Sequence, residues 1–100
     1  MNKPHVGNLR RRDERFFPLV RAGKYVLSMQ GSEEHYCVPQ VNCDRLGEYA
    51  AVEVVVFLND EVVQCPIEKF SERFNACSGI MAPYMPLNEV QELFEELLNS

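Results

Sequence analysis

The sequence predicts an α+β fold, in which a small antiparallel β-sheet of three to five strands packs on two C-terminal helices. Three observations support this fold class. A run of β-branched and aromatic residues near 51–65 is divided by a polar pair, as in a β-hairpin. Two later segments, at about 66–78 and 88–99, repeat apolar residues with helical spacing. The chain has 100 residues and an apolar share of 46%, which suit one globular domain.

The N-terminal part of the chain is polar and rich in turn-forming residues. Proline, glycine and asparagine punctuate residues 1–8, so we expect a flexible segment there, followed by a single globular domain over 9–100. Asn8 is suited to cap a short helix over about 9–17, which Pro18 would end.

Strands are expected in the middle of the chain. Residues 24–29 and 35–38 are strand-like. Pro39 indicates that the second run is an edge strand or that a strand ends there, because proline cannot donate to a ladder. Residues 40–47 are expected to form a loop. The hairpin follows near 51–65, with Asn59-Asp60 as its turn, since both residue types tolerate positive φ.

Two amphipathic helices complete the chain. Pro66 suits the first turn of one helix, and Gly79 suits its end. Its apolar stripe consists of Ile67, Phe70, Phe74 and Cys77. Asn88 suits the cap of the last helix, with Gln91 as its capping-box partner. The inner face of that helix consists of Val90, Leu93, Phe94, Leu97 and Leu98.

The charge of the chain is divided by position. Residues 1–24 hold seven basic and two acidic residues, whereas residues 25–100 hold three basic and thirteen acidic residues, so the net charge of −5 combines +5 with −10. Such asymmetry gives information about partners rather than about the fold. It defines two candidate surfaces, one basic and one acidic.

The basic arm is the cluster Arg10, Arg11, Arg12 and Arg15. Phe16 and Phe17 follow it, and arginine beside aromatic rings suits contact with phosphates and stacked bases. However, the anionic body would repel a phosphate backbone. Three interpretations stay open for the arm: it binds nucleic acid, it forms ion pairs with the chain's own acids, or it docks on an acidic protein partner.

The acidic face is the outer side of the last helix, formed by Glu89, Glu92, Glu95 and Glu96. Its plainest interpretation is a solvated helix surface. A functional interpretation is a carboxylate row that competes with nucleic acid for a cationic groove on a partner, helped by long-range electrostatic steering.

Neither the cysteines nor the histidines predict a catalytic or metal site. The densest patch is His35, Cys37 and Cys43, which lacks the paired spacing of a zinc site. His35 and Cys37 share one side of the expected strand, but a cysteine nucleophile needs an orienting group as well as a base, and none is identifiable. No glycine-rich phosphate loop is present. We therefore expect no catalytic residue, no metal and no cofactor.

Two resemblances add to these inferences. Residues 54–74, and within them Cys65-Pro66-Ile67-Glu68-Lys69-Phe70, resemble small SH3-like barrel domains in which a strand ends in a Pro-aliphatic-acid turn. In size, acidity and lack of motifs, the chain resembles phage-encoded inhibitors of host defence, including anti-CRISPR proteins.

The function expected from these observations is that of a small, acidic, non-enzymatic binding protein that inhibits a protein partner by occupying its surface. The alternative is a nucleic-acid-binding accessory protein that uses the basic arm. The polar N-terminus lacks the apolar region of a secretory signal, and the longest apolar run, 54–58, is far shorter than a membrane span, so we expect a cytoplasmic protein without a membrane partner. The apolar helix faces exceed what a small sheet covers, which favours a homodimer.

Overall fold

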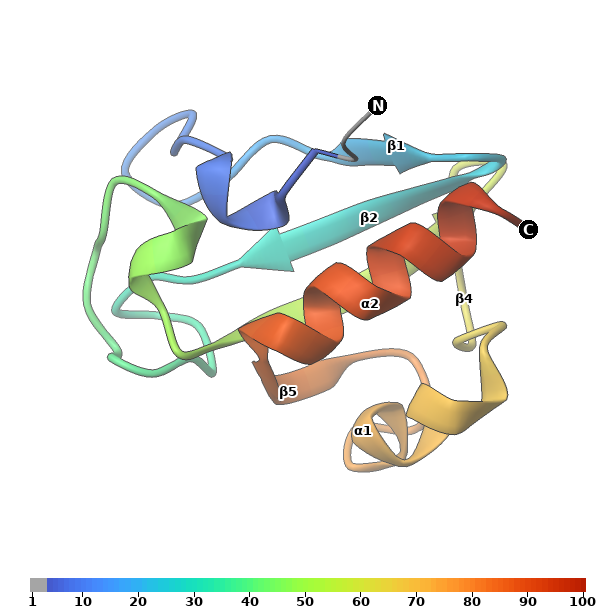
Figure 1. The fold of residues 1–100 in the computed structure, drawn as a ribbon. Coiled ribbons are helices and arrows are strands. Elements are labelled where there is room, and N and C mark those ends of the chain that lie inside the picture. Colours follow the sequence, from blue (N-terminus) through green and yellow to red (C-terminus); the bar gives the residue numbers. More distant parts are fainter. Residues whose placement is uncertain (1–3) are drawn as a thin grey trace.

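The computed structural model describes residues 4–100, and it shows an antiparallel sheet with a helical layer on one face (Figure 1). Within these residues the sheet has five strands, so the predicted α+β class with a three- to five-stranded sheet is confirmed. The strands are β1 (Val20–Ala22), β2 (Tyr25–Gln30), β3 (Ala51–Leu58), β4 (Glu61–Val63) and β5 (Ala82–Pro86). The sheet is open rather than closed into a barrel, with β1 at one edge and with β4 and β5 side by side along the other.

The hairpin of β3 and β4 is confirmed at the predicted turn. Asn59 and Asp60 have φ values of 52° and 65°, the left-handed conformation that a two-residue type I′ turn requires at both positions. β4 ends at Val63, two residues before the predicted end of the hairpin. The reason is that β5 pairs with the other half of the same edge of β3, from Ala51 to Val54.

The two faces of the sheet differ in burial. On the inner face, β2 and β3 place fully buried side chains: Leu27, Met29, Val52, Val54 and Val56. On the outer face, alternate residues such as Val26, Val55 and Phe57 are only partly buried. The hairpin of β1 and β2 turns at Gly23, whose φ is 65°. A Cβ atom at this position would lie only 2.7 Å from the carbonyl oxygen of Leu97, so a side chain does not fit.

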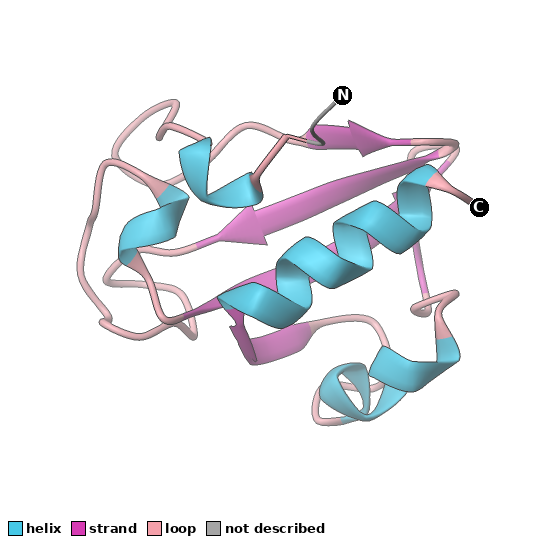
Figure 2. Ribbon diagram, in the orientation of Figure 1, coloured by secondary structure: helices cyan, strands magenta, loops and turns pink. Residues whose placement is uncertain are grey.

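The last helix, α2 (Leu87–Leu98), lies across the inner face of the sheet (Figure 2). Its buried residues are Val90, Leu93, Phe94 and Leu97, so the predicted inner face is confirmed apart from half-buried Leu98. The predicted cap is wrong. The helix begins at Leu87, so Asn88 lies inside it, and the residue before it, Pro86, is in extended conformation and makes no capping bond with its side chain.

The preceding helix is shorter than predicted. A 3-10 turn, η3 (Glu68–Phe70), leads into a short α-helix, α1 (Ser71–Asn75). Phe70 and Phe74 of the predicted stripe are buried. Ser78 and Gly79 adopt positive φ of 59° and 80° and turn the chain toward β5, so the helix cannot continue to residue 78.

The predicted helix over 9–17 is wrong, because this segment bonds to another part of the chain. The Arg11 N–H donates to the Asp44 carbonyl at 2.8 Å, and the Leu46 N–H donates to the Leu9 carbonyl at 3.0 Å. Local helical bonds in so short a segment are too weak to compete. Within residues 40–47, expected as a loop, the chain enters a short 3-10 helix, η2 (Leu46–Glu48).

Two other expectations concern short segments. Residues 35–38 do not form the expected strand, and only Val38 makes a single bridge, with Ala51. Of the expected flexible segment 1–8, residues 1–3 lie outside the described part of the chain. Further on, η1 (Val6–Asn8) begins at buried Val6, whose N–H donates to the Gln91 side chain at 2.8 Å.

Candidate protein-binding surfaces

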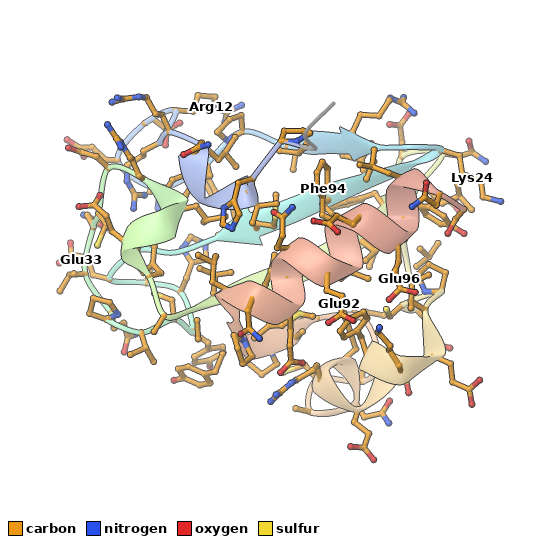
Figure 3. The ribbon with its side chains drawn as sticks, viewed as in Figure 1. Arg12, Lys24, Glu33, Glu92, Phe94 and Glu96 are labelled. Atoms are coloured by element: carbon orange, nitrogen blue, oxygen red, sulfur yellow. The ribbon has the colours of Figure 1, made fainter. Side chains whose placement is uncertain are left out.

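The acidic face of α2 is held by two cations from the preceding helical segment. Arg73 of α1 bonds Glu89 through both ends of its guanidinium, with Nε at 3.0 Å from Oε1 and Nη2 at 2.5 Å from Oε2. The Lys69 Nζ of η3 contacts Glu92 and lies 2.9 Å from Oε2 of Glu96. Figure 3 shows Glu92 and Glu96 on the side of α2 that faces α1.

This arrangement follows from helical spacing. Glu89, Glu92 and Glu96 lie at i, i+3 and i+7, so they share one side of α2, as the sequence predicts. Lys69 and Arg73 are four residues apart, and their side chains meet that row across the gap between the two segments. Sequence reasoning missed these cations, although their spacing matches that of the glutamates.

Hydrogen bonds in these ion pairs shift the pKa values of Glu89, Lys69 and Arg73. Hydrogen bonds from Arg73 lower the pKa of Glu89 below its ordinary value. Bonds to Glu92 and Glu96 raise the pKa of Lys69, and the bond to Glu89 raises the pKa of Arg73. The bond to Arg73 therefore favours the charged form of Glu89 and restrains its position.

The acidic face extends beyond α2. Glu68 and Glu72 on η3 and α1 are exposed, and within residues 4–100 neither forms an ion pair. Glu95 accepts a hydrogen bond from the Gln91 side chain at 2.7 Å. In η3, α1 and α2 together, six carboxylates against two cations leave a net charge of −4.

Arg11 of the basic arm points into the body of the protein. Its Nε donates to the Cys43 carbonyl at 2.8 Å, and its Nη2 donates to the Gly31 carbonyl at 2.8 Å and to the Tyr49 hydroxyl at 2.7 Å. Its guanidinium carbon lies 4.6 Å from the centre of the Phe17 ring. Arg11 thus joins distant segments of the chain instead of facing solvent.

The other arginines of the arm stay at the surface. The Nε of Arg15 donates to Oε2 of Glu34 at 2.9 Å, and the Nε of Arg12 lies 3.5 Å from Oδ2 of Asp13. Arg10 is exposed, and its backbone bridges that of Arg45, a cation that the sequence analysis did not group with the arm. The four arginines therefore do not form one continuous basic surface.

Among the described residues, His35 and Cys37 share no hydrogen bond, and each instead contacts Ser32. The Cys37 thiol is buried and donates to the Ser32 carbonyl at 3.2 Å, and burial raises the pKa of this thiol. His35 Nδ1 instead lies 2.6 Å from the Ser32 hydroxyl. Within residues 4–100, no three His, Cys, Asp or Glu side chains are grouped to hold a metal ion. The described helices include none with the length and apolar character needed to cross a membrane.

Fold and surfaces together define a small two-layer α+β domain with an acidic helical face. No family model matches the chain, and no curated protein or solved structure shows a significant match to it.

Proposed function

We propose that this chain is a non-enzymatic binding protein that inhibits a protein partner by occupying its surface with the acidic face. The partner class is nucleic-acid-handling or defence machinery, as for phage-type, anti-CRISPR-like inhibitors. Such machinery presents cationic grooves, which a row of carboxylates can occupy in place of phosphates.

The observation that carries the proposal is the restraint of the carboxylates. Lys69 and Arg73 hold Glu89, Glu92 and Glu96 in position, while Glu68 and Glu72 extend the same anionic surface. Side chains that are already ordered lose less conformational entropy on binding. The net negative charge of this layer also attracts a cationic partner over a distance of about one Debye length.

The test of this proposal is capture of a partner from the native host at two salt concentrations. We expect a stable protein partner at low salt and weaker capture at high salt, because screening reduces the attraction between opposite charges. If no protein is retained at either salt concentration, the proposal is wrong.

The alternative function is nucleic-acid binding through the basic arm. Exposed Arg10 and Arg12, with Arg45 beside Arg10, support it. It predicts a gel shift that fades steeply as salt rises and that disappears in the double variant Arg10→Ala and Arg12→Ala. Arg11 should be left intact in this test, because it holds the fold. The absence of a shift at low salt would exclude this function.

We also propose a cytoplasmic location and a homodimer. The four cysteines of the described chain are all free, which suits a reducing compartment. The helix faces do not supply a dimer surface, because Phe70, Phe74 and the inner face of α2 are buried within one chain. The outer sheet face, with Val26, Phe57 and Val62 in one cross-strand row, is now the surface that a second copy would cover.

A further inference from the structure

Two tyrosines form a half-exposed aromatic pair at one edge of the sheet. The ring centres of Tyr36 and Tyr84 are 5.8 Å apart, with an angle of 42° between their planes. Their exposed fractions are 50% and 46%, so each ring presents much of its surface to solvent. Tyrosines in this state are typical of the residues that dominate binding energy in protein interfaces.

Backbone hydrogen bonds place a carboxylate beside this pair. The Tyr84 N–H donates to the Tyr36 carbonyl at 3.1 Å, and the Tyr36 N–H donates to Oε2 of Glu53 at 2.7 Å. The pairing of β3 with β5 is irregular between Val52 and Val54, so Glu53 faces the bulged part of β5 that carries Tyr84. A loop and two strands thus bring together Tyr36, Tyr84 and Glu53.

The backbone at Tyr84 is strained. Its φ is 53°, a left-handed conformation that is costly for a residue with a large side chain and that glycine would adopt freely. The ring is half-exposed, so burial in the core does not account for a tyrosine here. Strain of this kind, displaying an aromatic ring to solvent, points to a binding role.

We propose that Tyr36, Tyr84 and Glu53 form an anchor for an arginine side chain of the protein partner, and this inference rests on the proposed function. A guanidinium stacks on tyrosine rings, whose faces are electron-rich, and it pairs with a carboxylate through parallel hydrogen bonds. Of the two Glu53 oxygens, Oε2 holds the Tyr36 N–H, and no bond to Oε1 occurs within the described residues. The negative charge of Glu53 therefore favours a cationic side chain.

The position of the anchor agrees with this role. Tyr84 lies three residues before α2, so the anchor is at the end of α2 where the acidic face begins with Glu89. Glu53 lies on the outer face of the sheet and α2 on the inner face, so a partner would reach both the anchor and the acidic face by contacting this edge of the domain. The arginine would fix the register in which the partner meets the glutamates.

The test is an NMR titration of the whole chain with three small probes: acetyl-arginine amide, acetyl-citrulline amide and acetyl-lysine amide. Citrulline keeps the shape of arginine but has no charge. We expect saturable shifts at Tyr36, Tyr84 and Glu53 with the arginine probe, and much smaller shifts with the other two. If the arginine probe causes no saturable shift there, or if citrulline or lysine matches it, the inference is wrong.

Two variants that should lose binding, and one control that should keep it, sharpen the titration. Tyr84→Gly removes the ring and relieves the positive φ, so its melting temperature should stay within about 5 °C of the parent while its affinity for the arginine probe falls about tenfold or more. Glu53→Gln keeps an oxygen for the Tyr36 N–H but removes the negative charge, so it should also weaken binding of the arginine probe. Unchanged affinity in either folded variant contradicts the anchor. Tyr36→Phe, which keeps the ring, should bind like the parent, and weakened binding there would contradict recognition by the ring face.

A further variant separates this inference from the proposed function. The double change Glu92→Gln and Glu96→Gln alters the acidic face without touching the anchor, so the arginine titration should be unchanged in it. If partner capture fails while the parent chain binds the arginine probe, the proposed function is wrong and the anchor remains. If capture succeeds but the probe does not bind, only the anchor is wrong.

Discussion

Arg11 joins three segments of the chain at one guanidinium, and its removal tests whether the basic arm is structural. We expect Arg11→Ala to lower the free energy of unfolding by about 2–4 kcal/mol, because it removes charged hydrogen bonds to two carbonyls and a hydroxyl and the contact with Phe17. Urea denaturation measures the change.

Arg10→Ala is the matched control for this variant. Arg10 is exposed, so its loss should change the free energy of unfolding by no more than about 0.5 kcal/mol. Equal destabilisation by the two substitutions would show that Arg11 does not have the structural role described above.

At this scale the sequence was only partly informative. The row of Glu89, Glu92 and Glu96 was predictable, because helical spacing is local. The role of Arg11 was not, because its partners lie 20 to 38 positions away and nothing nearby marks them. The same is true of the Tyr36–Tyr84 pair, which depends on how a loop meets β5.

Among the elements, the turn between β3 and β4 gives a direct test of local backbone energetics. Asp60 has a φ of 65°, so Asp60→Gly should raise the free energy of unfolding by about 0.5–1 kcal/mol, since glycine is favoured at the second position of a type I′ turn. Asp60→Ala should lower it, because alanine is disfavoured at positive φ. Urea denaturation of both variants checks the signs, and changes of the same sign would contradict the turn.

The contact between α1 and α2 predicts an acid dependence of stability. The pKa of Glu89 is lower in the folded chain than the ordinary glutamate value of about 4.3, because Arg73 bonds the charged form. The stability from this pair is therefore complete above about pH 5 and is lost as pH falls through the folded-state pKa.

Glu89→Gln measures this contribution. The loss of unfolding free energy between about pH 5 and pH 3 should be smaller in this variant by about 0.5–1 kcal/mol, as for other surface ion pairs. Glu61→Gln is the control, because Glu61 is exposed on β4 and has no ion-pair partner within residues 4–100. An identical pH profile for Glu89→Gln and the parent would contradict the pair.

The elements that the sequence predicted well are those specified by nearby residues. The hairpin is encoded by its turn and β-branched strands, and α2 by its apolar spacing. The helix over 9–17 was wrong because backbone groups of residues 44–46 compete for the same hydrogen bonds. Such competition between distant segments leaves no local pattern in the sequence.

For the whole molecule, the homodimer is a separate prediction. Phe94 is only 4% exposed and points from α2 toward the sheet (Figure 3), so Phe94→Ala should lower the free energy of unfolding by about 3–5 kcal/mol without testing a dimer contact. Phe57→Lys on the outer sheet face should instead convert a dimer to a monomer. Light scattering distinguishes these states, and a strict monomer of the parent at high concentration would rule out the dimer.

The most direct test of the central claim compares two double variants of equal net charge for affinity toward the captured partner. Glu92→Gln with Glu96→Gln neutralises the acidic face, whereas Glu14→Gln with Glu33→Gln neutralises two exposed acids away from it, where Figure 3 shows Glu33. By calorimetric titration, we expect the first to weaken binding about tenfold or more and the second to leave it nearly unchanged. Equal affinity of the two variants for the partner would contradict binding through the acidic face.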